Sequence, residues 1–149
     1  MTFKTPVSVL VLIHTPDLQV LLLERADKPG FWQSVTGSLE DGETLREAAV
    51  REVREEAGLE AERYLLSDWH YSNVYEIYPH WRHRYAPKVT HNTEHVFGLE
   101  LPAPLPITLA PREHVRYEWV DWRLAAPRVF SWTNVEALRK LGELRGLTL

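Results

Sequence analysis

A run of glutamates on one predicted helix carries the first chemical signal in this sequence. The stretch GSLEDGETLREAAVREVREEAGLE extends from Gly37 to Glu60 and contains eight acidic side chains. Because a helix turns by about 100° per residue, Glu52, Glu55 and Glu56 share one stripe of its surface. Like charges three or four positions apart on a helix repel each other. Such a stripe is therefore a solvated acidic face, a protein interface or a cation site.

The arginines of this helix do not balance all of its glutamates. Arg51 lies four positions from both Glu47 and Glu55 and can pair with either. Glu52 and Glu56 have no cation three or four positions away. Mg²⁺ takes oxygen ligands from one or two carboxylates while it keeps water and phosphate oxygens, and carboxylates at i and i+4 can converge on one ion. The pattern therefore predicts a divalent-metal site at Glu52 and Glu56.

The elements that must hold this helix follow from the apolar periodicity and the turn residues. Strands are predicted at 7–13 and 20–24, joined by a turn at Pro16-Asp17, and a short strand at 33–36 precedes a loop at 37–42. The acidic helix begins at Glu43 or Thr44 and ends at Gly58. Further strands are predicted within 64–81, at 93–101 and at 115–122, and a closing helix extends from Ser131 or Thr133 to Gly146. This mixture predicts an α/β fold in which helices cover a sheet.

Composition and charge narrow the classes of function. The chain has 149 residues, of which 44% are hydrophobic and 26% charged, so we expect one globular domain spanning 1–149. A net charge of -4 argues against a nucleic-acid partner, and the lack of cysteine excludes thiol catalysis and thiolate zinc sites. The apolar run at 7–13 is better explained by a buried strand than by a signal peptide. We therefore expect a cytoplasmic monomer without a membrane partner.

The spacing of residues around the acidic helix resembles the Nudix box. Gly37 is followed after five residues by Glu43, and after seven more by REVREEAGL at 51–59, so every defining position is filled. Because of this resemblance, a solvated acidic face is a weak alternative to a metal site on this helix. It implies the Nudix fold, an α/β/α sandwich with a mixed central sheet. It also implies a hydrolase that acts on a nucleoside diphosphate linked to another group.

The resemblance also implies roles for the residues of the helix. Glu52 and Glu56 would bind Mg²⁺, for which Mn²⁺ can substitute. Glu55 would be a further ligand or would polarise the attacking water. Arg51 would orient Glu52 or Glu55 rather than contact the substrate. Divalent ions suit this chemistry because they neutralise phosphate charge and lower the pKa of bound water.

Segments outside the helix resemble the bacterial dihydroneopterin triphosphate pyrophosphatases of folate synthesis. Val35-Thr36-Gly37 stands where many Nudix proteins have Pro-Gly-Gly, and HWRHRYAPKVTHNTEH, REHVRYEWVD and SWTN extend the resemblance from about Lys4 to Asn134. That family releases pyrophosphate from dihydroneopterin triphosphate and leaves the monophosphate. The resemblance implies a third metal carboxylate at Glu113. It implies substrate contacts at Lys4, Arg25, Thr36, Tyr75, Glu76, Ile77, Tyr78 and Ser131.

These implied contacts suit a small-molecule substrate with a phosphate tail and a flat ring. Lys4 and Arg25 can bind phosphate oxygens, and arginine offers a planar fork of donors. The YEIY segment at 75–78 offers aromatic faces and the Glu76 carboxylate, which can accept N–H groups of a pterin. Plainer explanations exist for each residue, and for Ser131 the plainer one is a helix cap.

Two other functions remain open at this point. A Nudix hydrolase acting on (deoxy)nucleoside triphosphates would carry the same box. A domain that binds ligands without cleaving them is disfavoured, because such domains usually lose glutamates that this chain keeps. The histidine pairs 80/83 and 91/95 have spacings found in metal sites, but without flanking cysteines we expect no zinc there.

Overall fold

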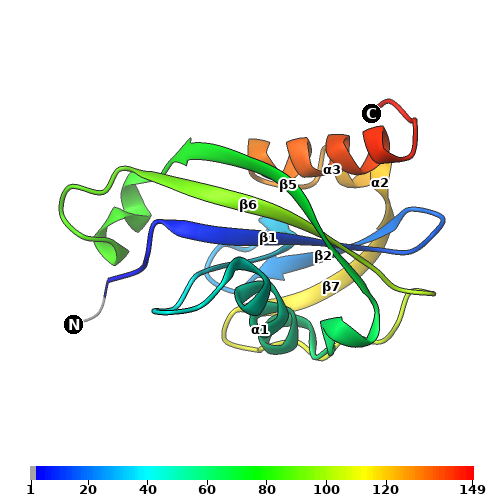
Figure 1. Cartoon of the computed structure of the whole chain (residues 1–149), viewed down its shortest axis with the longest axis horizontal. Helices are drawn as coiled ribbons and strands as arrows, with labels where there is room; N and C mark the ends of the chain where they lie inside the picture. Colours follow the sequence, from blue (N-terminus) through cyan, green and yellow to red (C-terminus); the bar gives the residue numbers. More distant parts are fainter. Residues whose placement is uncertain (1–2) are drawn as a thin grey trace.

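A computed structural model describes residues 3–149 and shows a mixed β-sheet between helical layers (Figure 1). The strands are β1 (Val7–His14), β2 (Gln19–Arg25), β3 (Trp32–Gln33), β4 (Val35–Ser38), β5 (Leu65–Glu76), β6 (His91–Glu100) and β7 (His114–Asp121). The helices are α1 (Leu45–Ala57), α2 (Trp122–Ala125) and α3 (Trp132–Leu144), with short 3-10 helices η1 (Ala61–Arg63) and η2 (Pro79–Arg84). Among the described residues, no helix combines the length and hydrophobicity that a bilayer crossing requires.

The sheet has seven strands, and its mixed directions confirm the mixed central sheet that the resemblance implies. Its order is β3-β2-β1-β6-β5, while β4 also pairs with β1 and β7 with β2. β1 and β6 are parallel, and the other pairings are antiparallel. β1 is therefore a central strand, and it is held by neighbours that come from distant parts of the chain.

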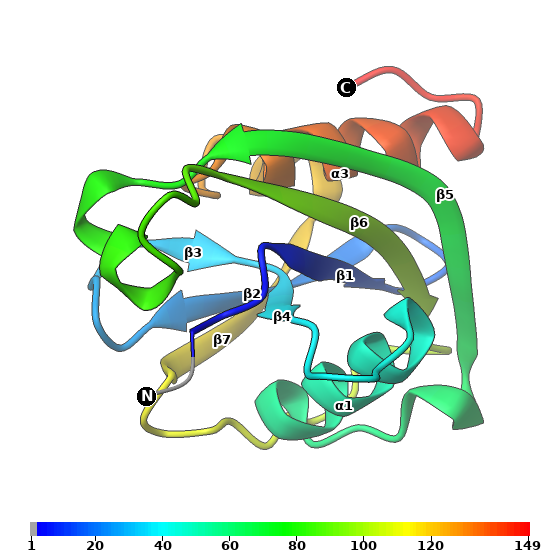
Figure 2. The ribbon, with the colours of Figure 1, turned by 60° about the vertical axis from the view of Figure 1, so that its left-hand side comes forward.

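Alternate residues of β1 face opposite helical layers. Val9, Val11 and Ile13 belong to the core cluster that packs against α1, whereas Leu10 and Leu12 belong to the cluster that packs against α3. Side chains alternate along a strand, so the unbroken apolar run at 7–13 reflects burial on both faces. Figures 1 and 2 show α1 and α3 on opposite faces of the sheet, and the predicted α/β/α sandwich is confirmed.

Both predicted ends of the acidic helix α1 are confirmed. Thr44 is the N-cap: its hydroxyl accepts from the Glu47 N–H at 3.1 Å, and the Glu47 carboxylate accepts from the Thr44 N–H at 2.9 Å. This reciprocal pair is a capping box, and an N-cap of this kind is worth about 1 kcal/mol. Gly58 ends the helix in the left-handed conformation, with φ of 69°. These caps set the residues at which α1 begins and ends.

The single strand predicted at 33–36 is wrong, because this segment forms parts of two strands. β3 pairs with β2 and β4 pairs with β1, so the chain passes from one partner to the other at Ser34. The Ser34 N–H donates to the Asn134 side-chain oxygen at 2.8 Å, and the Asn134 amide donates to the Ser34 hydroxyl at 3.0 Å. β4 continues to Ser38, so the loop predicted to begin at Gly37 begins after it. The break depends on a residue 100 positions away, which no local pattern reveals.

Candidate active site

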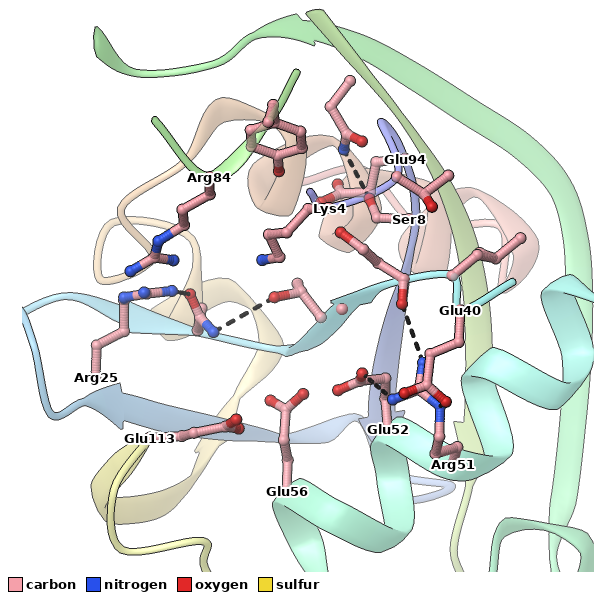
Figure 3. Close-up of a pocket in the computed structure, with 18 of the residues that line it drawn as sticks. Lys4, Ser8, Arg25, Glu40, Arg51, Glu52, Glu56, Arg84, Glu94 and Glu113 are labelled. Atoms are coloured by element: carbon pink, nitrogen blue, oxygen red, sulfur yellow. Dashed lines mark hydrogen bonds and ion pairs between the residues drawn. The ribbon is translucent and has the colours of Figure 1, made fainter. Parts of the chain in front are cut away.

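Two cavities share lining residues near the N-terminal end of β1 and the acidic face of α1, and Figure 3 shows the one that contains the acidic face. The larger has a volume of about 720 Å³ and is lined by Glu52, Glu56 and Glu113 among others. The smaller has a volume of about 120 Å³ and lies near the start of α3. Residues that line both are Lys4, Arg25, Gln33, Thr36, Tyr75, Arg84, Tyr85 and Glu94. One elongated molecule can therefore occupy both cavities at once.

Glu56 is a buried carboxylate without a partner. Only 1% of the residue is exposed, and neither carboxylate oxygen has a hydrogen-bond partner among the described residues. Burial, followed by the nearby Glu52 and Glu113, raises the pKa of Glu56 well above its ordinary value. Burying an unpaired carboxylate is costly unless a cation binds it. The donor chemistry around Glu56 therefore fits a metal ion.

The other potential ligands converge on Glu56 from across the cavity. Glu56, Glu113 and His114 each offer one ligand atom, and these atoms lie within 4.8 Å of one another. Glu113 precedes β7, and its partial burial together with the charges of Glu52 and Glu55 raises its pKa. His114 is buried, its Nδ1 lies 3.9 Å from Glu56 Oε1, and burial lowers its pKa to about 4. A neutral imidazole beside two carboxylates is compatible with a divalent cation.

Arg51 organises the acidic residues at the edge of the cavity. Its guanidinium lies 2.7 Å from Glu43 Oε2, 2.6 Å from Glu52 Oε1 and 3.3 Å from Glu55 Oε2. It also donates to the Ser38 carbonyl at 3.0 Å. Glu52 has no cation three or four positions away, but Arg51 contacts it directly, which supports the implied role of Arg51 in orienting Glu52 or Glu55. The partner of Glu52 is the preceding residue in the chain, which a comparison at three and four positions does not examine.

Gly37 on β4 lies directly against the Glu52 carboxylate. A Cβ atom built on Gly37 would lie 2.1 Å from Glu52 Cδ and 2.3 Å from Glu52 Oε1. The strand can pass this close only because position 37 carries no side chain. The first glycine of the motif therefore leaves room for the carboxylate, which Arg51 holds from the other side.

Glu55 is placed differently from the other acidic residues. Its side chain is about half exposed and contacts Arg51, and it does not belong to the lining of either cavity. Its charge nevertheless acts on Glu113. The structure thus brings Glu52, Glu56 and Glu113 together at the cavity and leaves Glu55 at its rim.

The predicted cations Lys4 and Arg25 line both cavities together with Thr36. Burial and the nearby Arg84 lower the pKa of Lys4, while Glu52 and Glu113 act in the opposite direction. Arg25 donates to Gln33 Oε1 at 3.1 Å, and its guanidinium lies 4.6 Å from the centre of the Trp81 ring. These cations lie between the carboxylates and the smaller cavity, where they can contact an anionic chain.

The segment 75–78 and Ser131 line the smaller cavity, as expected of substrate contacts. The Glu76 carboxylate, however, is exposed and lies 2.6 Å from Arg82 Nη2. The Ser131 hydroxyl accepts from the Asn134 N–H as the N-cap of α3, so the plainer explanation for Ser131 also applies.

Aromatic side chains that sequence reasoning did not single out complete the smaller cavity. Trp81 and Phe130 belong to its lining, and their ring centroids lie 6.1 Å apart in an edge-to-face arrangement. Tyr78 lies 5.4 Å from Trp81 in the same group. Tyr78 and Trp81 lie in the connection between β5 and β6, and Phe130 lies just before α3. Only the fold therefore brings these rings together.

Glu94 on β6 is a further residue that sequence reasoning missed. The residue is 4% exposed, its Oε1 has no hydrogen-bond partner among the described residues, and it lines both cavities. Burial raises its pKa to about 7, against an opposing effect of Thr133. A signal was present: the period-two pattern of a strand places Glu94 on the same face as Val96, which is a core residue.

We expect divalent metal to raise the melting temperature, and to do so more strongly at high pH. The pKa of Glu56 is raised on folding, so the metal-free protein loses stability as pH rises from the ordinary carboxylate range through that raised value. Bound metal requires the ionised form and reverses this loss. Thermal melts with Mg²⁺ and with EDTA at about pH 6 and about pH 8.5 measure the difference. An equal shift at both pH values would contradict the role of Glu56.

Comparisons with known proteins agree with this arrangement. A family model described as the NUDIX domain matches residues 4–141. Dihydroneopterin triphosphate diphosphatase of Escherichia coli (strain K12) is 48% identical over 141 residues, which cover 93% of each chain. The protein of the same name from Haemophilus influenzae is 41% identical over 143 residues, covering 94% of this chain and 89% of the other. A solved structure of the E. coli dihydroneopterin triphosphate pyrophosphohydrolase has a TM-score of 0.87 at 47% identity, covering 94% of this chain and 97% of the other.

Proposed function

The chain belongs to the NUDIX family, and on that basis we propose that it hydrolyses dihydroneopterin triphosphate to dihydroneopterin monophosphate and pyrophosphate. One observation of the structure carries this proposal. A cluster of carboxylates that fits a divalent metal shares a continuous space with an aromatic cavity. A substrate with a triphosphate tail and a flat ring matches both ends.

At the phosphate end, we assign the metal to Glu52, Glu56 and Glu113. Mg²⁺ is the expected ion, with Mn²⁺ as a substitute, and such an ion neutralises phosphate charge and lowers the pKa of bound water. The unpaired oxygens of Glu56 and the steric fit of Glu52 against Gly37 support the assignment. His114 is a neighbour that the sequence did not suggest.

Arg51, Glu52 and Glu55 form the proposed catalytic group on the same helix. Arg51 positions the carboxylates of Glu52 and Glu55 through direct contacts with both. The position of Glu55 at the rim supports a role in accepting a proton from water, because a proton held there can leave to solvent. Glu52 is more deeply buried than Glu55, and this position supports metal binding as its main role.

The remaining proposed contacts divide between the tail and the ring. Lys4 and Arg25 are placed to bind phosphate oxygens, and Thr36 offers a hydroxyl beside them. Tyr75, Glu76, Ile77, Tyr78 and Ser131 border the ring cavity, together with Trp81 and Phe130. Aromatic side chains favour a flat ring because stacked or edge-to-face rings attract each other.

We also propose that the protein acts in the cytoplasm as a single-domain monomer on small molecules rather than on nucleic acid or membranes. The net charge of -4 supports the lack of a nucleic-acid partner, and the two joined cavities support a small-molecule substrate.

A panel of triphosphates tests the proposed activity. We expect kcat/KM for dihydroneopterin triphosphate to exceed that for dATP, CTP and GTP, with pyrophosphate and the monophosphate as products. GTP should be the best nucleotide, because guanine shares the amino-pyrimidinone edge of a pterin. Product identification by chromatography, with and without EDTA, gives the measurement and its control. A nucleotide such as dATP that outperforms the pterin compound would leave the family membership intact and refute the proposed substrate.

A further inference from the structure

The ring of the proposed substrate has a polar edge that must be matched inside the protein. A 2-amino-4-oxopyrimidine ring presents two adjacent donors, the ring N3–H and the exocyclic amino group. A carboxylate can accept both through two parallel hydrogen bonds, in the same geometry with which it binds the donor fork of arginine. Without such an acceptor, burying this edge would leave donors unpaired, which costs affinity.

Glu76 is poorly placed to be that acceptor. Its carboxylate is exposed and lies 2.6 Å from Arg82 Nη2, so it already has a charged partner. A ring that took it would have to compete with both Arg82 and water.

Glu94 meets the requirements that Glu76 does not. It is buried, it borders both cavities, and its Oε1 has no hydrogen-bond partner among the described residues. Figure 3 shows Glu94 and Ser8 at one side of the cavity and Glu52, Glu56 and Glu113 at the other. An acceptor at this place is separated from the metal carboxylates, as a ring is from its phosphate tail.

On the basis of the proposed function, we infer that Glu94 determines specificity by accepting both N–H groups of the 2-amino-4-oxopyrimidine edge of the substrate. β6 lies between β1 and β5, where Glu94 is opposite Ser8 on one side and Asn73 on the other. A side chain on such a central strand has a fixed position, and a fixed position is what recognition of a ring edge requires. Tyr75, which also borders both cavities, contributes an aromatic wall beside it.

The environment of Glu94 is consistent with a role in binding. Burial raises its pKa to about 7, and the hydrogen bond with Thr133 offsets only part of this effect. Two N–H donors from a bound ring would stabilise the ionised form. The structure thus keeps an acceptor whose hydrogen bonds are completed by a ligand.

The same contact explains which nucleotides should be weak substrates. Guanine presents N1–H and a 2-amino group, and it matches a carboxylate as a pterin does. Adenine presents an amino group beside the unprotonated N1, whose lone pair would oppose a carboxylate oxygen. Hypoxanthine, the base of ITP, lacks only the amino group of guanine. A site that hydrogen-bonds this amino group should discriminate against ITP.

The decisive experiment combines a protein variant with a change in the ligand. We expect Glu94→Gln to lower kcat/KM for dihydroneopterin triphosphate by about 30-fold, the range of a charged hydrogen bond. Turnover of dATP should be unchanged or higher, because an amide can accept from the adenine amino group and donate to N1. Wild-type protein should prefer GTP to ITP by about 10-fold, and the variant should lose this preference. Glu136→Gln on α3, a glutamate that lines neither cavity and is paired with Arg139, is the matched control and should retain the wild-type ratios.

Binding in the absence of turnover gives a second readout. Neopterin, which has no phosphate, should bind EDTA-treated wild-type protein, and Glu94→Gln should bind it about 30-fold more weakly in calorimetry. Melting curves establish that the variant is folded. If it is not, the GTP-to-ITP ratio of the wild-type protein still decides, since a ratio near one overturns the inference.

These experiments distinguish failure of the inference about Glu94 from failure of the proposed function. If the wild-type protein prefers dihydroneopterin triphosphate to dATP and Glu94→Gln keeps that preference, the inference about Glu94 is overturned and the proposed function stands. An equal loss on all substrates would likewise overturn it, because it would indicate a structural role. If the wild-type protein prefers dATP, the proposed function fails, and the inference fails with it.

Discussion

Replacing Glu56 with glutamine is expected to lower metal-dependent turnover by about 1,000-fold while the protein remains folded. The substitution removes one negative charge and keeps the shape of the side chain. Glu56 is the most buried of the clustered carboxylates, and both of its oxygens lack a hydrogen-bond partner among the described residues. Losing its charge therefore removes a metal ligand that has no other partner among the described residues.

Stability measurements separate loss of the metal site from loss of the fold. Near neutral pH the metal-free Glu56→Gln variant should melt at the wild-type temperature or above it, because it lacks a buried charge that Glu52 and Glu113 repel. The rise in melting temperature on adding Mg²⁺ should be much smaller than in the wild-type protein. Glu136→Gln on α3, a partly exposed residue paired with Arg139, makes the same chemical change and should alter neither property. Wild-type turnover by Glu56→Gln at ordinary Mg²⁺ would refute the assignment.

Adding one methyl group at Gly37 should have the second largest effect, a loss of turnover of about 100-fold. The backbone at Gly37 is not left-handed, so alanine introduces no backbone strain. The new Cβ would instead lie 2.1 Å from Glu52 Cδ and displace that carboxylate from its contact with Arg51. The end of a side chain moves more easily than a strand, so we expect the fold to persist and the metal site to be distorted.

A double-mutant cycle identifies the cause of this loss. In a Glu52→Ala background, the methyl group of Gly37→Ala has no carboxylate to displace, and it should cause little further change in activity or melting temperature. The metal-induced rise in melting temperature, measured for all four proteins, gives a readout where activity is low. If the two substitutions are instead additive, Gly37 acts by another route. Wild-type activity of Gly37→Ala would show that the position of Glu52 is unimportant.

The sequence was sufficient to predict the sandwich and the acidic helix for identifiable physical reasons. The ends of α1 depend on Thr44 and Gly58, whose capping chemistry is local. The apolar run of β1 reflects burial on both faces of a central strand. Convergence of Glu52 and Glu56 on one side of a helix requires only the helical repeat.

Other features depend on contacts that local patterns do not contain. The division between β3 and β4 follows from hydrogen bonds to Asn134. Arg51 reaches Glu52 because Glu43 and the Ser38 carbonyl, which lie before the helix, orient its guanidinium. The aromatic cavity combines Trp81 with Phe130, which are remote in sequence.

Glu94 combines one property that the sequence could predict with one that it could not. Its burial could be inferred from the alternation with Val96, but its proximity to both cavities could not. A glutamate in a strand is usually solvent-exposed. The side chain therefore becomes informative only when the fold shows that the described neighbours leave its Oε1 without a hydrogen bond.

The hydrogen bonds between Ser34 and Asn134 also set an order of events during protein synthesis. They fix the crossing from β3 to β4, the strand that carries Thr36 and Gly37 into the cavity. The two partners are 100 positions apart, so the interval between their synthesis is about 5 to 20 seconds at ordinary translation rates. A nascent chain can complete the glutamate motif long before it contains the residue that anchors the preceding strand. The complete site can therefore form only late in synthesis, after the C-terminal helix has been made.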